Sequence, residues 1–597
     1  MVRFSNRHLL SIMLAQGVLA TLPAAMASAA TVENPLCPSN TAFFNPTGPI
    51  DIKVPAGFKA SVFAAGLNAP TGLAFLRVGD GDNDRDDRNK FEVYVLESGH
   101  GLPSACNDEA AFQAMHPHTA NPFTPDVLVF NSKGVLLRTL GKPTDASTET
   151  GGNGVFQPHG PAVDLAFENG LAGGRLFATD SNQATHAHNG QNNSSRIVTL
   201  NRFTGIVTPF VTQLPTGDHP TEQLAFKGKW IYWSQGSTTN SGVVGLDNGG
   251  GANQPDIPCQ DIVLSNNVFD SGVAKTSGYS PFGTTRPGAT VKAFEGASHH
   301  GVCDGAILRT RLDVKNPADS IEPFSWGYRN GYAIAFAPED HALKGGLLVG
   351  EDGPDERGAR PSNGAPDVLQ LAHQNDDGTP DYHGWPDRFG FLPSSQAVFN
   401  PVGGPADDLC VFDAANPPSF CTPASLAKIL SEDVPIRDVL AFPPQPITSP
   451  LAIEAADSSF TGIAFAPNSF AGGPVERGAA LYALEGDFGF SAPNATAPAP
   501  EVGHEIKLIN FSEPGDALAL KVMGFARNKA GDQAFVAGVN GFNRPTNLRF
   551  GPDGCAWVAD YGAVRDLGSD SHFVGPPANG PLLQIPGTGV IWRICRQ

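Results

Sequence analysis

The sequence predicts an all-β fold, a six-bladed β-propeller with long loop insertions, and two observations carry this prediction. The first is composition. With 68 glycines and 52 prolines in 597 residues, long uninterrupted helices are scarce, because both residues disfavour the helix interior. Hydrophobic residues make up 41% of the chain, which is enough to fill a large core. The second observation is a sequence pattern that occurs six times.

Each copy of the pattern reads as two short strands joined by a turn. A small residue or a proline leads into a strand that ends in Phe, and a second strand then runs into Gly, Asp or Glu. The first strands are PTGLAF (70–75), PAVDLAF (161–167), PTEQLAF (220–226), GYAIAF (331–336), FTGIAF (460–465) and PTNLRF (545–550). The second strands are VYVLESG (93–99), RLFATDSN (175–182), WIYWSQGS (230–237), GLLVGEDG (346–353), LYALEGD (481–487) and AWVADYG (556–562).

Six such hairpins along one chain predict six blades arranged around a central axis. A hairpin alone cannot bury both of its faces, and stacking around a central channel buries them. The residues that end equivalent strands then line one common mouth. Unrelated hairpins in another all-β protein are the alternative, and the matching strand endings weigh against it.

The ends of the predicted propeller fit ring closure. GFKASVFAAGL (57–67) precedes the first copy, GVIWRI (589–594) lies at the end of the chain, and both read as strands. Pairing the N-terminal strand into the last blade would remove an open sheet edge. Blade spacing is uneven, and we expect Gly/Pro-rich insertions at about 238–325 and 387–450 to cover one face and shape a binding site.

The first 29 residues read as a secretory signal peptide, with a basic start, an apolar run and the small residues Ala27-Ser28-Ala29 at the end. We therefore expect a secreted or periplasmic protein with one propeller domain over 30–597. No later segment approaches the roughly 18 consecutive apolar residues of a membrane span. The formal charge of −20 argues against nucleic acid or anionic membranes as partners.

Eight cysteines, none in a C-x-x-C pair, give no support for a zinc ribbon or a c-type haem. With an export signal, disulfides are the better interpretation, and Cys410–Cys421 and Cys555–Cys595 are candidate pairs. The sequence leaves the connectivity open.

Several motifs occur in an order that resembles the glucose/sorbosone dehydrogenases, over most of residues 57–597 apart from the insertions. The motifs are HPTEQLAFKGKWIYWSQGSTTN (219–240), WGYRNGYAIAF (326–336), EDGP (351–354), APDVLQL (365–371), YHGWP (382–386) and RPTNLRFGPDG (544–554). The first of these is most similar to the L-sorbosone dehydrogenase branch. Members of this family are soluble six-bladed propeller enzymes that use pyrroloquinoline quinone (PQQ) with calcium.

The resemblance implies a function. The chain would oxidise an aldose or a sugar aldehyde, sorbosone-like, by hydride transfer to the quinone. The electrons would pass to an external acceptor, since the sequence has no haem motif.

The resemblance also implies cofactor contacts for Arg329, Asn330 and Arg544. PQQ is a tricarboxylate with an ortho-quinone, which suits bidentate cations and amide donors. The alternative for Arg329 is a structural ion pair with a nearby carboxylate. Three departures from the family pattern favour a propeller without chemistry: Ala333 replaces a glycine, Thr546 replaces a second arginine, and a lysine expected near the fifth copy is absent from ALEGDFGF.

His219 is the candidate general base by resemblance. An imidazole titrates near neutrality, which suits removal of a proton from an anomeric hydroxyl. His159, in QPHGPAVDLAF, precedes the second copy in nearly the same way and is the runner-up. The alternative for His219 is a surface histidine in a turn.

For calcium, the resemblance implies the backbone carbonyls of Gly353 and Pro354, with Asp367 as a supporting carboxylate. A plain turn is the alternative at Gly353-Pro354. The acidic segment DGDNDRDD (80–87) is either a second calcium loop or a solvated acidic loop.

Two rival functions remain open. A calcium-dependent propeller hydrolase, such as a lactonase, would use mouth carboxylates, and a binding propeller would carry no chemistry. The cations Arg329 and Arg544 favour the dehydrogenase, because a lactonase calcium site needs no cation facing its metal. The substituted positions favour the binding propeller.

Overall fold

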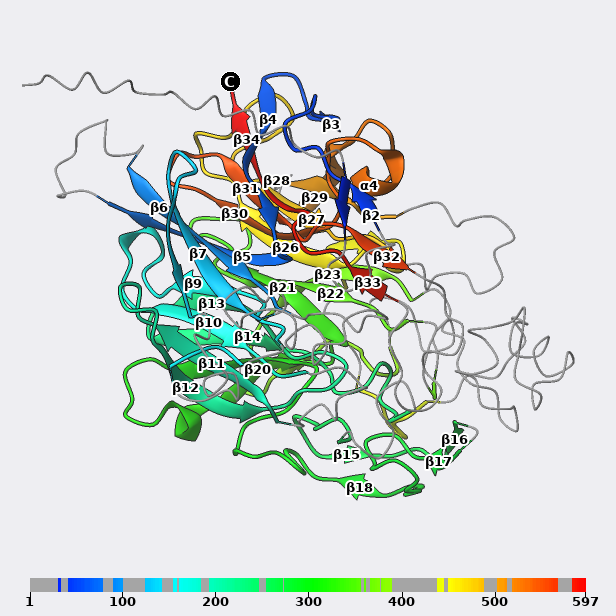
Figure 1. The fold of residues 1–597 in the computed structure, drawn as a ribbon. Helices are drawn as coiled ribbons and strands as arrows, with labels where there is room; N and C mark the ends of the chain where they lie inside the picture. The colour runs from blue at the N-terminus through cyan, green and yellow to red at the C-terminus, as the bar shows by residue number, and fades with distance from the viewer. Residues whose placement is uncertain are drawn as a thin grey trace, which may run out of the picture.

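The computed structural model describes the following residues: 31–33, 41–78, 90–99, 124–141, 154–157, 160–183, 193–245, 254–271, 273–355, 359–360, 365–375, 377–388, 438–444, 449–487, 502–512, 518–566 and 582–597. Within them the protein is nearly all β, with one short α-helix, α4 (Ala534–Ala537), and 3-10 turns at η3 (Gly170–Ala172) and η6 (Pro317–Ser320). The strands form six blades of a β-propeller, which confirms the predicted fold class (Figure 1).

Every copy of the repeated pattern forms the two innermost strands of a blade. The inner strands are β5 (Pro70–Arg77), β9 (Leu165–Phe167), β13 (Thr221–Lys227), β21 (Asn330–Phe336), β26 (Phe460–Phe465) and β30 (Pro545–Phe550). The second strands are β6 (Phe91–Glu97), β10 (Leu176–Asp180), β14 (Trp230–Gln235), β22 (Leu347–Asp352), β27 (Ala480–Leu484) and β31 (Ala556–Asp560). We number the blades 1 to 6 in this order.

The outer strands complete each antiparallel sheet. Blades 1 and 2 add β7 (Asp126–Asn131), β8 (Leu136–Leu140), β11 (Ser195–Leu200) and β12 (Val207–Leu214). Blade 3 adds β19 (Ala306–Arg311), β20 (Glu322–Trp326) and the parallel strand β24 (Asp381–Tyr382). Blades 4 and 5 add β23 (Asp367–Ala372), β25 (Ala452–Glu454), β28 (Glu505–Ser512), β29 (Ala519–Asn528) and β3 (Ile52–Lys53).

Blade 6 closes the ring with strands from both ends of the chain. β34 (Gly589–Arg596) pairs with β31 on one side and with β4 (Phe58–Leu67) on the other, so the predicted closure is confirmed. The predicted disulfide Cys555–Cys595 joins β34 to the residue that precedes β31. Cys410 and Cys421 lie outside the described residues.

The mouth of the propeller, as we use the term, is the face where the inner strands begin and the second strands end. In five blades the inner strand shifts its pairing register near this end. Such bulges re-aim side chains and release backbone groups from the ladder. Asp180, Asp352 and Asp560 each end a second strand, so the acidic endings of the pattern meet at this face, as the repeat predicted.

Below the mouth, polar side chains join the blades across the axis. Asp164 Oδ2 accepts a hydrogen bond from Arg549 Nη2 over 2.9 Å, and Asp164 Oδ1 accepts one from Asn547 Nδ2 over 3.0 Å. Gln223 Nε2 donates to the carbonyl oxygen of Thr461 over 2.7 Å, which links blades 3 and 5. These contacts hold the inner strands at fixed positions around the axis.

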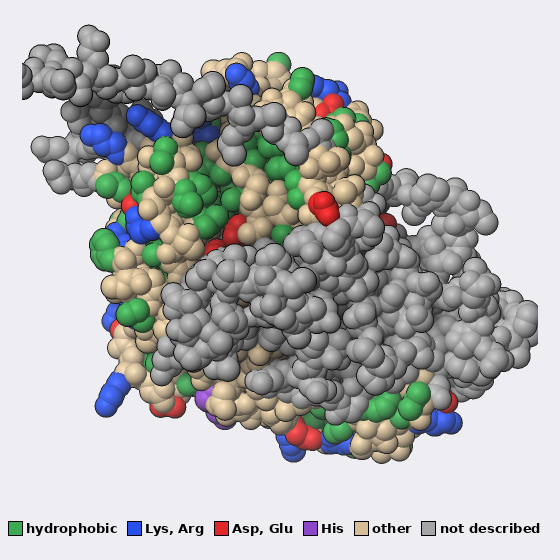
Figure 2. Space-filling view, in the orientation of Figure 1, with side chains coloured by type: hydrophobic (Ala, Val, Ile, Leu, Met, Phe, Trp, Pro, Cys, Tyr) green, Lys and Arg blue, Asp and Glu red, His purple; other side chains and the backbone are tan. Residues whose placement is uncertain are grey.

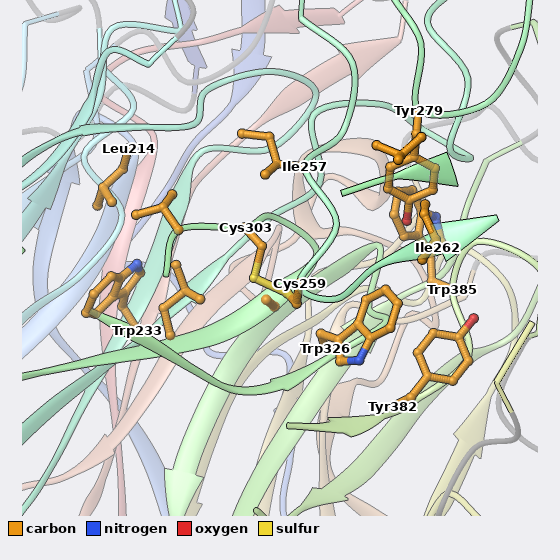
Figure 3. Packing of buried hydrophobic residues seen from close by; sticks show 14 of the residues in the cluster. Leu214, Trp233, Ile257, Cys259, Ile262, Tyr279, Cys303, Trp326, Tyr382 and Trp385 are labelled. Carbon is orange, nitrogen blue, oxygen red and sulfur yellow. A yellow bond between two sulfur atoms is a disulfide. The ribbon is translucent and has the colours of Figure 1, made fainter. Parts of the chain in front are cut away.

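The largest apolar cluster lies around blade 3 and the segment inserted between its strands β14 and β19 (Figure 3). Trp326 packs against Tyr382 with ring centroids 4.7 Å apart, and the disulfide Cys259–Cys303 lies in the same cluster. The inserted segment carries the short strands β15 (Ile262–Val263), β16 (Phe269–Asp270), β17 (Lys275–Thr276) and β18 (Thr290–Val291). The range expected for this insertion, 238–325, also contains β19 and most of β20, which belong to blade 3.

Two surface findings bear on partners. Among the described residues, no helix has the length and hydrophobicity needed to cross a membrane. On the face in Figure 2, the described Lys and Arg side chains lie mostly near the outline, several of them at the upper left.

Candidate functional site

The candidate site lies at the mouth, where blade 3 meets blade 4. Backbone hydrogen bonds fix the relative positions of its segments. The amide of His219 donates to the carbonyl oxygen of Ser237 over 3.0 Å, and the amide of Ser237 donates to the carbonyl oxygen of Arg329 over 2.8 Å. The amide of Arg329 in turn donates to Glu351 Oε1 over 3.0 Å. The loop before β13 is thereby held against the start of β21.

Arg329 is the hub of this site. Its Nη1 donates to the carbonyl oxygen of Gly353 over 2.9 Å, and its Nη2 contacts Asp218 Oδ2 at 3.1 Å and Asp355 Oδ2 at 2.6 Å. The residue is 3% exposed, and its Nε has no hydrogen-bond partner among the described residues. Arg329 therefore forms the structural ion pairs considered above and also keeps one buried donor unused.

His219 shares Asp218 with this arginine. His219 Nε2 lies 3.4 Å from Asp218 Oδ2, and His219 Nδ1 lies 4.0 Å from Glu222 Oε1. Asp218 thus lies nearest to Nε2 and Glu222 nearest to Nδ1 of the ring. His159, the runner-up base, lies outside the described residues.

Asn330 and Asp352 form the next contact toward blade 5, with Asn330 Nδ2 donating to Asp352 Oδ2 over 3.2 Å. Gly236 lets Asn330 approach His219, because a Cβ there would stand 2.2 Å from His219 Cβ and 3.3 Å from Asn330 Oδ1. Asn330 Oδ1, Asp352 Oδ1 and Glu222 Oε2 are buried and have no hydrogen-bond partner in the part of the chain that the structure describes.

The three residues expected at calcium also come together. Asp367 Oδ1 accepts a hydrogen bond from the amide of Gly353 over 2.7 Å, and Asp367 Oδ2 accepts one from the amide of Ser459 over 2.7 Å. Pro354 follows Gly353 directly and is buried. As the chain stands, the Asp367 carboxylate holds the backbone at Gly353 in place, and the Gly353 carbonyl faces the guanidinium of Arg329.

Burial and mutual repulsion raise the pKa of several carboxyl groups at the mouth. Burial first, and then the charge of Glu485, raise the pKa of Glu222 well above its usual range. Burial first, and then the charge of Asp367, do the same to the pKa of Asp352. The pKa of Glu485 is raised to about 7 by burial, against a lowering effect of Arg544. Carboxyl groups from blades 3, 4 and 5 thus influence one another's ionisation at the mouth.

Arg544 lies on the same face, at the start of blade 6. Its amide donates to Asp560 Oδ1 over 2.8 Å, and its Nη1 and Nη2 donate to the carbonyl oxygens of Gly486 and Asp487, each over 2.8 Å. The guanidinium therefore lies against the segment that ends the second strand of blade 5.

The two substituted positions have structural roles. Thr546 Oγ1 donates to the carbonyl oxygen of Pro70 over 2.8 Å, which ties blade 6 to blade 1. Ala333 is fully buried in the apolar cluster that also contains Leu348 and Phe460. The Cβ of Ala333 therefore fills core space.

Sequence reasoning missed three mouth residues, Glu222, Glu485 and Tyr561. The sequence offers a signal for Glu222, which lies four positions before the Phe that ends its strand. The other five copies carry an uncharged residue at that position: Thr71, Val163, Tyr332, Thr461 and Thr546. A lone carboxylate at the start of a buried strand is unusual and marks the position. Glu485 and Tyr561 follow β27 and β31, where acidic and polar endings recur, so no signal separates them from the other copies.

No protein-family model and no curated protein matches the chain. Several solved structures are similar to it in fold. The PQQ domain of pyranose dehydrogenase from Coprinopsis cinerea is similar at 11% identity and a TM-score of 0.44, covering 91% of this chain and 97% of that chain. The calcium structure of a Trichoderma reesei Carbohydrate-Active Enzymes Family AA12 protein is similar at 14% identity and a TM-score of 0.46, covering 92% and 97%. The soluble aldose sugar dehydrogenase of Escherichia coli is similar at 12% identity and a TM-score of 0.42, covering 90% and 100%.

Proposed function

We propose that this protein oxidises a sugar, an aldose or a sugar aldehyde, at the mouth between blades 3 and 4, with PQQ and Ca²⁺ as cofactors. One observation carries the proposal. His219, Arg329, Gly353 and Asp367 come from motifs far apart in the sequence, yet contacts through Asp218 and the Arg329 guanidinium join them into one network.

The charges and unused polar atoms of this network fit a hard cation. Calcium prefers oxygen ligands, and the mouth offers the buried Asp352 Oδ1, which has no partner among the described residues. The carbonyl oxygen of Gly353 accepts one hydrogen bond, from Arg329 Nη1, and keeps a second lone pair for a cation. The single positive charge of Arg329 faces the two carboxylates of Asp218 and Asp355. The neighbourhood therefore stays negative when these groups are ionised, which favours a divalent cation.

The Nε donor of Arg329, which has no acceptor among the described residues, fits the anionic cofactor PQQ. Arg329 Nε points to no acceptor in the described chain, and a guanidinium suits carboxylate and quinone oxygens. When bound, PQQ supplies the two-electron acceptor for hydride. Asn330 and Arg544 are proposed to hold its oxygens, and the Gly353 and Pro354 carbonyls to hold calcium beside it.

The chain's own residues then handle the proton. His219 takes the proton of the anomeric hydroxyl while the hydride leaves C1, so an aldose becomes a lactone. Asp218 holds the imidazole and stabilises the positive charge that it gains. The electrons leave to an external acceptor.

The test is reconstitution. Purified full-length chain is loaded with Ca²⁺ and PQQ, and a redox dye is reduced in the presence of a panel of aldoses. We expect quinone absorbance that co-elutes with the protein and dye reduction that requires both cofactors. Lactone hydrolysis by the calcium-loaded chain without quinone would support the hydrolase instead. Absence of quinone binding would leave a binding propeller.

A further inference from the structure

The loop that carries Asp218 and His219 is held by two glutamine side chains from different blades. This loop, residues 215–220, connects β12 of blade 2 to β13 of blade 3. Gln235, at the end of β14 in blade 3, donates from Nε2 to the carbonyl oxygens at the two ends of the loop, those of Pro215 over 2.9 Å and Pro220 over 3.4 Å.

Gln183 of blade 2 binds the two carbonyls in the middle of the loop. Its Nε2 donates to the carbonyl oxygen of Gly217 over 2.8 Å and to that of Asp218 over 2.8 Å. These carbonyls belong to the residue before Asp218 and to Asp218 itself, so the contact lies directly beside the peptide bond that enters His219.

The backbone of Gln183 is itself fixed. Gln183 lies three residues after the end of β10, and its amide donates to the carbonyl oxygen of Gly160 over 2.9 Å. Asn182 forms a parallel bridge with Gly160, and the amide of Ser181 donates to the carbonyl oxygen of Pro161 over 3.1 Å. The side chain of Gln183 therefore extends to the loop from a hydrogen-bonded strand end.

The chemistry of the contact requires an amide donor. A glutamine side chain carries two N–H donors on Nε2 and an acceptor on Oε1. Both partners of Gln183 are carbonyl oxygens, so Nε2 faces them and can give one hydrogen to each. A glutamate of the same size would, when ionised, place acceptors against two acceptors.

The other side of the loop is held by the segment that follows β14. The amide of Asp218 donates to the carbonyl oxygen of Thr238 over 2.9 Å, and the amide of His219 donates to that of Ser237 over 3.0 Å. A Cβ at Gly217 would stand 2.4 Å from the carbonyl oxygen of Thr238, so the two segments are in close contact. Loss of the Gln183 donors releases one side of the loop and leaves these bonds in place.

We propose that Gln183 is a positioning residue whose two N–H donors fix the Asp218–His219 loop, and with it the imidazole of His219 beside Asp218 and Arg329. The role of His219 as a base rests on the proposed function, while the fixing of the loop rests on the hydrogen bonds of Gln183. Blade 2 thereby contributes to a site whose other residues come from blades 3 and 4.

The first test is the kinetics of Gln183→Met in the enzyme loaded with PQQ and Ca²⁺. Methionine is similar in length to glutamine and removes both donors. We expect kcat and kcat/KM to fall together by about tenfold or more, because a displaced base acts in the transition state. PQQ affinity should stay within about twofold of the parent, since the imidazole is not needed to hold a tricarboxylate.

Gln183→Glu separates hydrogen bonding from packing. An unperturbed glutamate has a pKa of about 4.3, and the protonated acid, which carries one O–H donor, is favoured against two carbonyl oxygens. The kcat of Gln183→Glu relative to the parent should therefore rise as pH falls from about 8 to about 5. The same ratio for Gln183→Met should stay flat, because methionine has no proton to gain.

Hydrogen exchange tests the loop without any sugar oxidation. In the full-length chain without cofactors, the amides of Asp218 and His219 should exchange about tenfold faster in Gln183→Met than in the parent, because their loop opens more often. Gln374→Glu is the matched control, since Gln374 Nε2 also donates to a loop carbonyl, that of Gly378 over 2.9 Å. It should leave both amides and kcat unchanged. Melting curves show that each variant is folded.

The outcomes separate the positioning role from the proposed function. Parent-like exchange in Gln183→Met, a reduced kcat without faster exchange, or a Gln183→Glu ratio that does not change with pH overturns the positioning role. If the parent oxidises no sugar, the proposed function fails and the exchange measurement alone decides whether Gln183 fixes the loop. If the parent oxidises a sugar and Gln183→Met does so equally well, the function stands and the positioning role is wrong.

Discussion

Arg329 donates a hydrogen bond from Nη1 to the carbonyl oxygen of Gly353, over 2.9 Å. This bond joins the two motifs that the resemblance assigned separately, one to the quinone and one to calcium. The guanidinium fixes the carbonyl while its own position is fixed by Asp218 and Asp355. Cofactor and metal binding are therefore expected to be coupled through this residue.

Arg329→Lys should lower PQQ affinity about tenfold or more, nearly as much as Arg329→Ala. Lysine keeps the charge but loses the planar fork, and a charge-assisted hydrogen bond is worth roughly 1.5–3 kcal/mol. The measurement is titration of the calcium-loaded apoprotein with PQQ. Parent-like affinity in Arg329→Lys would mean that Arg329 serves only its ion pairs.

His219→Ala should abolish sugar oxidation and leave PQQ affinity within about twofold of the parent, because the imidazole takes a proton and is not needed to hold a tricarboxylate. Asp218→Asn should retain part of the activity and shift its pH profile, since the Asp218 carboxylate lies 3.4 Å from His219 Nε2 and would stabilise the charged form of the ring. If His159→Ala abolishes activity and His219→Ala does not, the base is His159.

Removing calcium should lower the melting temperature. A ligand that binds only the native state stabilises it by mass action, by about 2.7 kcal/mol at a hundredfold excess over Kd. Melting curves with calcium and with chelator give the comparison. Asp352→Asn, which removes charge from the proposed calcium oxygen, should reduce the difference, and a chelator without effect on either protein would contradict the calcium site.

A buried acidic pair, which accepts hydrogen bonds from Thr238 and Thr239 behind the loop that carries Asp218, should make stability depend on pH. Burial raises the pKa of Asp256 from 3.8 to about 6, against hydrogen bonds from Thr239. The pKa of Asp304, which neighbours Asp256, is raised well above its usual range, first by burial and then by the charge of Asp256. At pH values between 3.8 and about 6, the native state therefore binds more protons than the unfolded state.

The stabilising contribution of protonated Asp256 is complete below the unfolded pKa and is lost as pH rises through about 6. The free energy of unfolding of the parent relative to Asp256→Asn should thus fall as pH rises across this window. Denaturant unfolding at several pH values measures the difference. A difference that is flat with pH would show that Asp256 titrates normally.

The disulfide Cys555–Cys595 should stabilise the closed ring. It spans 40 residues, and the chain-entropy estimate for a loop of that size is about 4 kcal/mol, with typical measured values of roughly 2–4 kcal/mol. Replacing both cysteines with serine should lower the free energy of unfolding by this amount. An unchanged value would mean that the pairing of β34 with β4 closes the ring alone.

The sequence by itself determined the blades and the face on which the site lies. Each copy of the pattern contains the inner hairpin of one blade, because strand periodicity and turn residues are local properties. Equivalent residues of stacked copies must share a face, so the strand endings at Asp180, Asp352 and Asp560 could be assigned to one mouth. The closing strand could also be predicted, because an unpaired edge needs a partner.

Only the tertiary structure decided which side chains meet across blades. The pairing of Arg329 with Asp218 and Asp355 depends on the loop before β13 lying against β21. The hydrogen bond from Gln223 to the carbonyl oxygen of Thr461 depends on how blades 3 and 5 face each other across the axis. The Cys259–Cys303 bridge and the point where the insertion returns to β19 depend on packing around Trp326. The reason is physical: periodicity fixes the face of a side chain within its own strand, whereas contacts between blades follow from bulges, blade rotation and the packing of the cores between them.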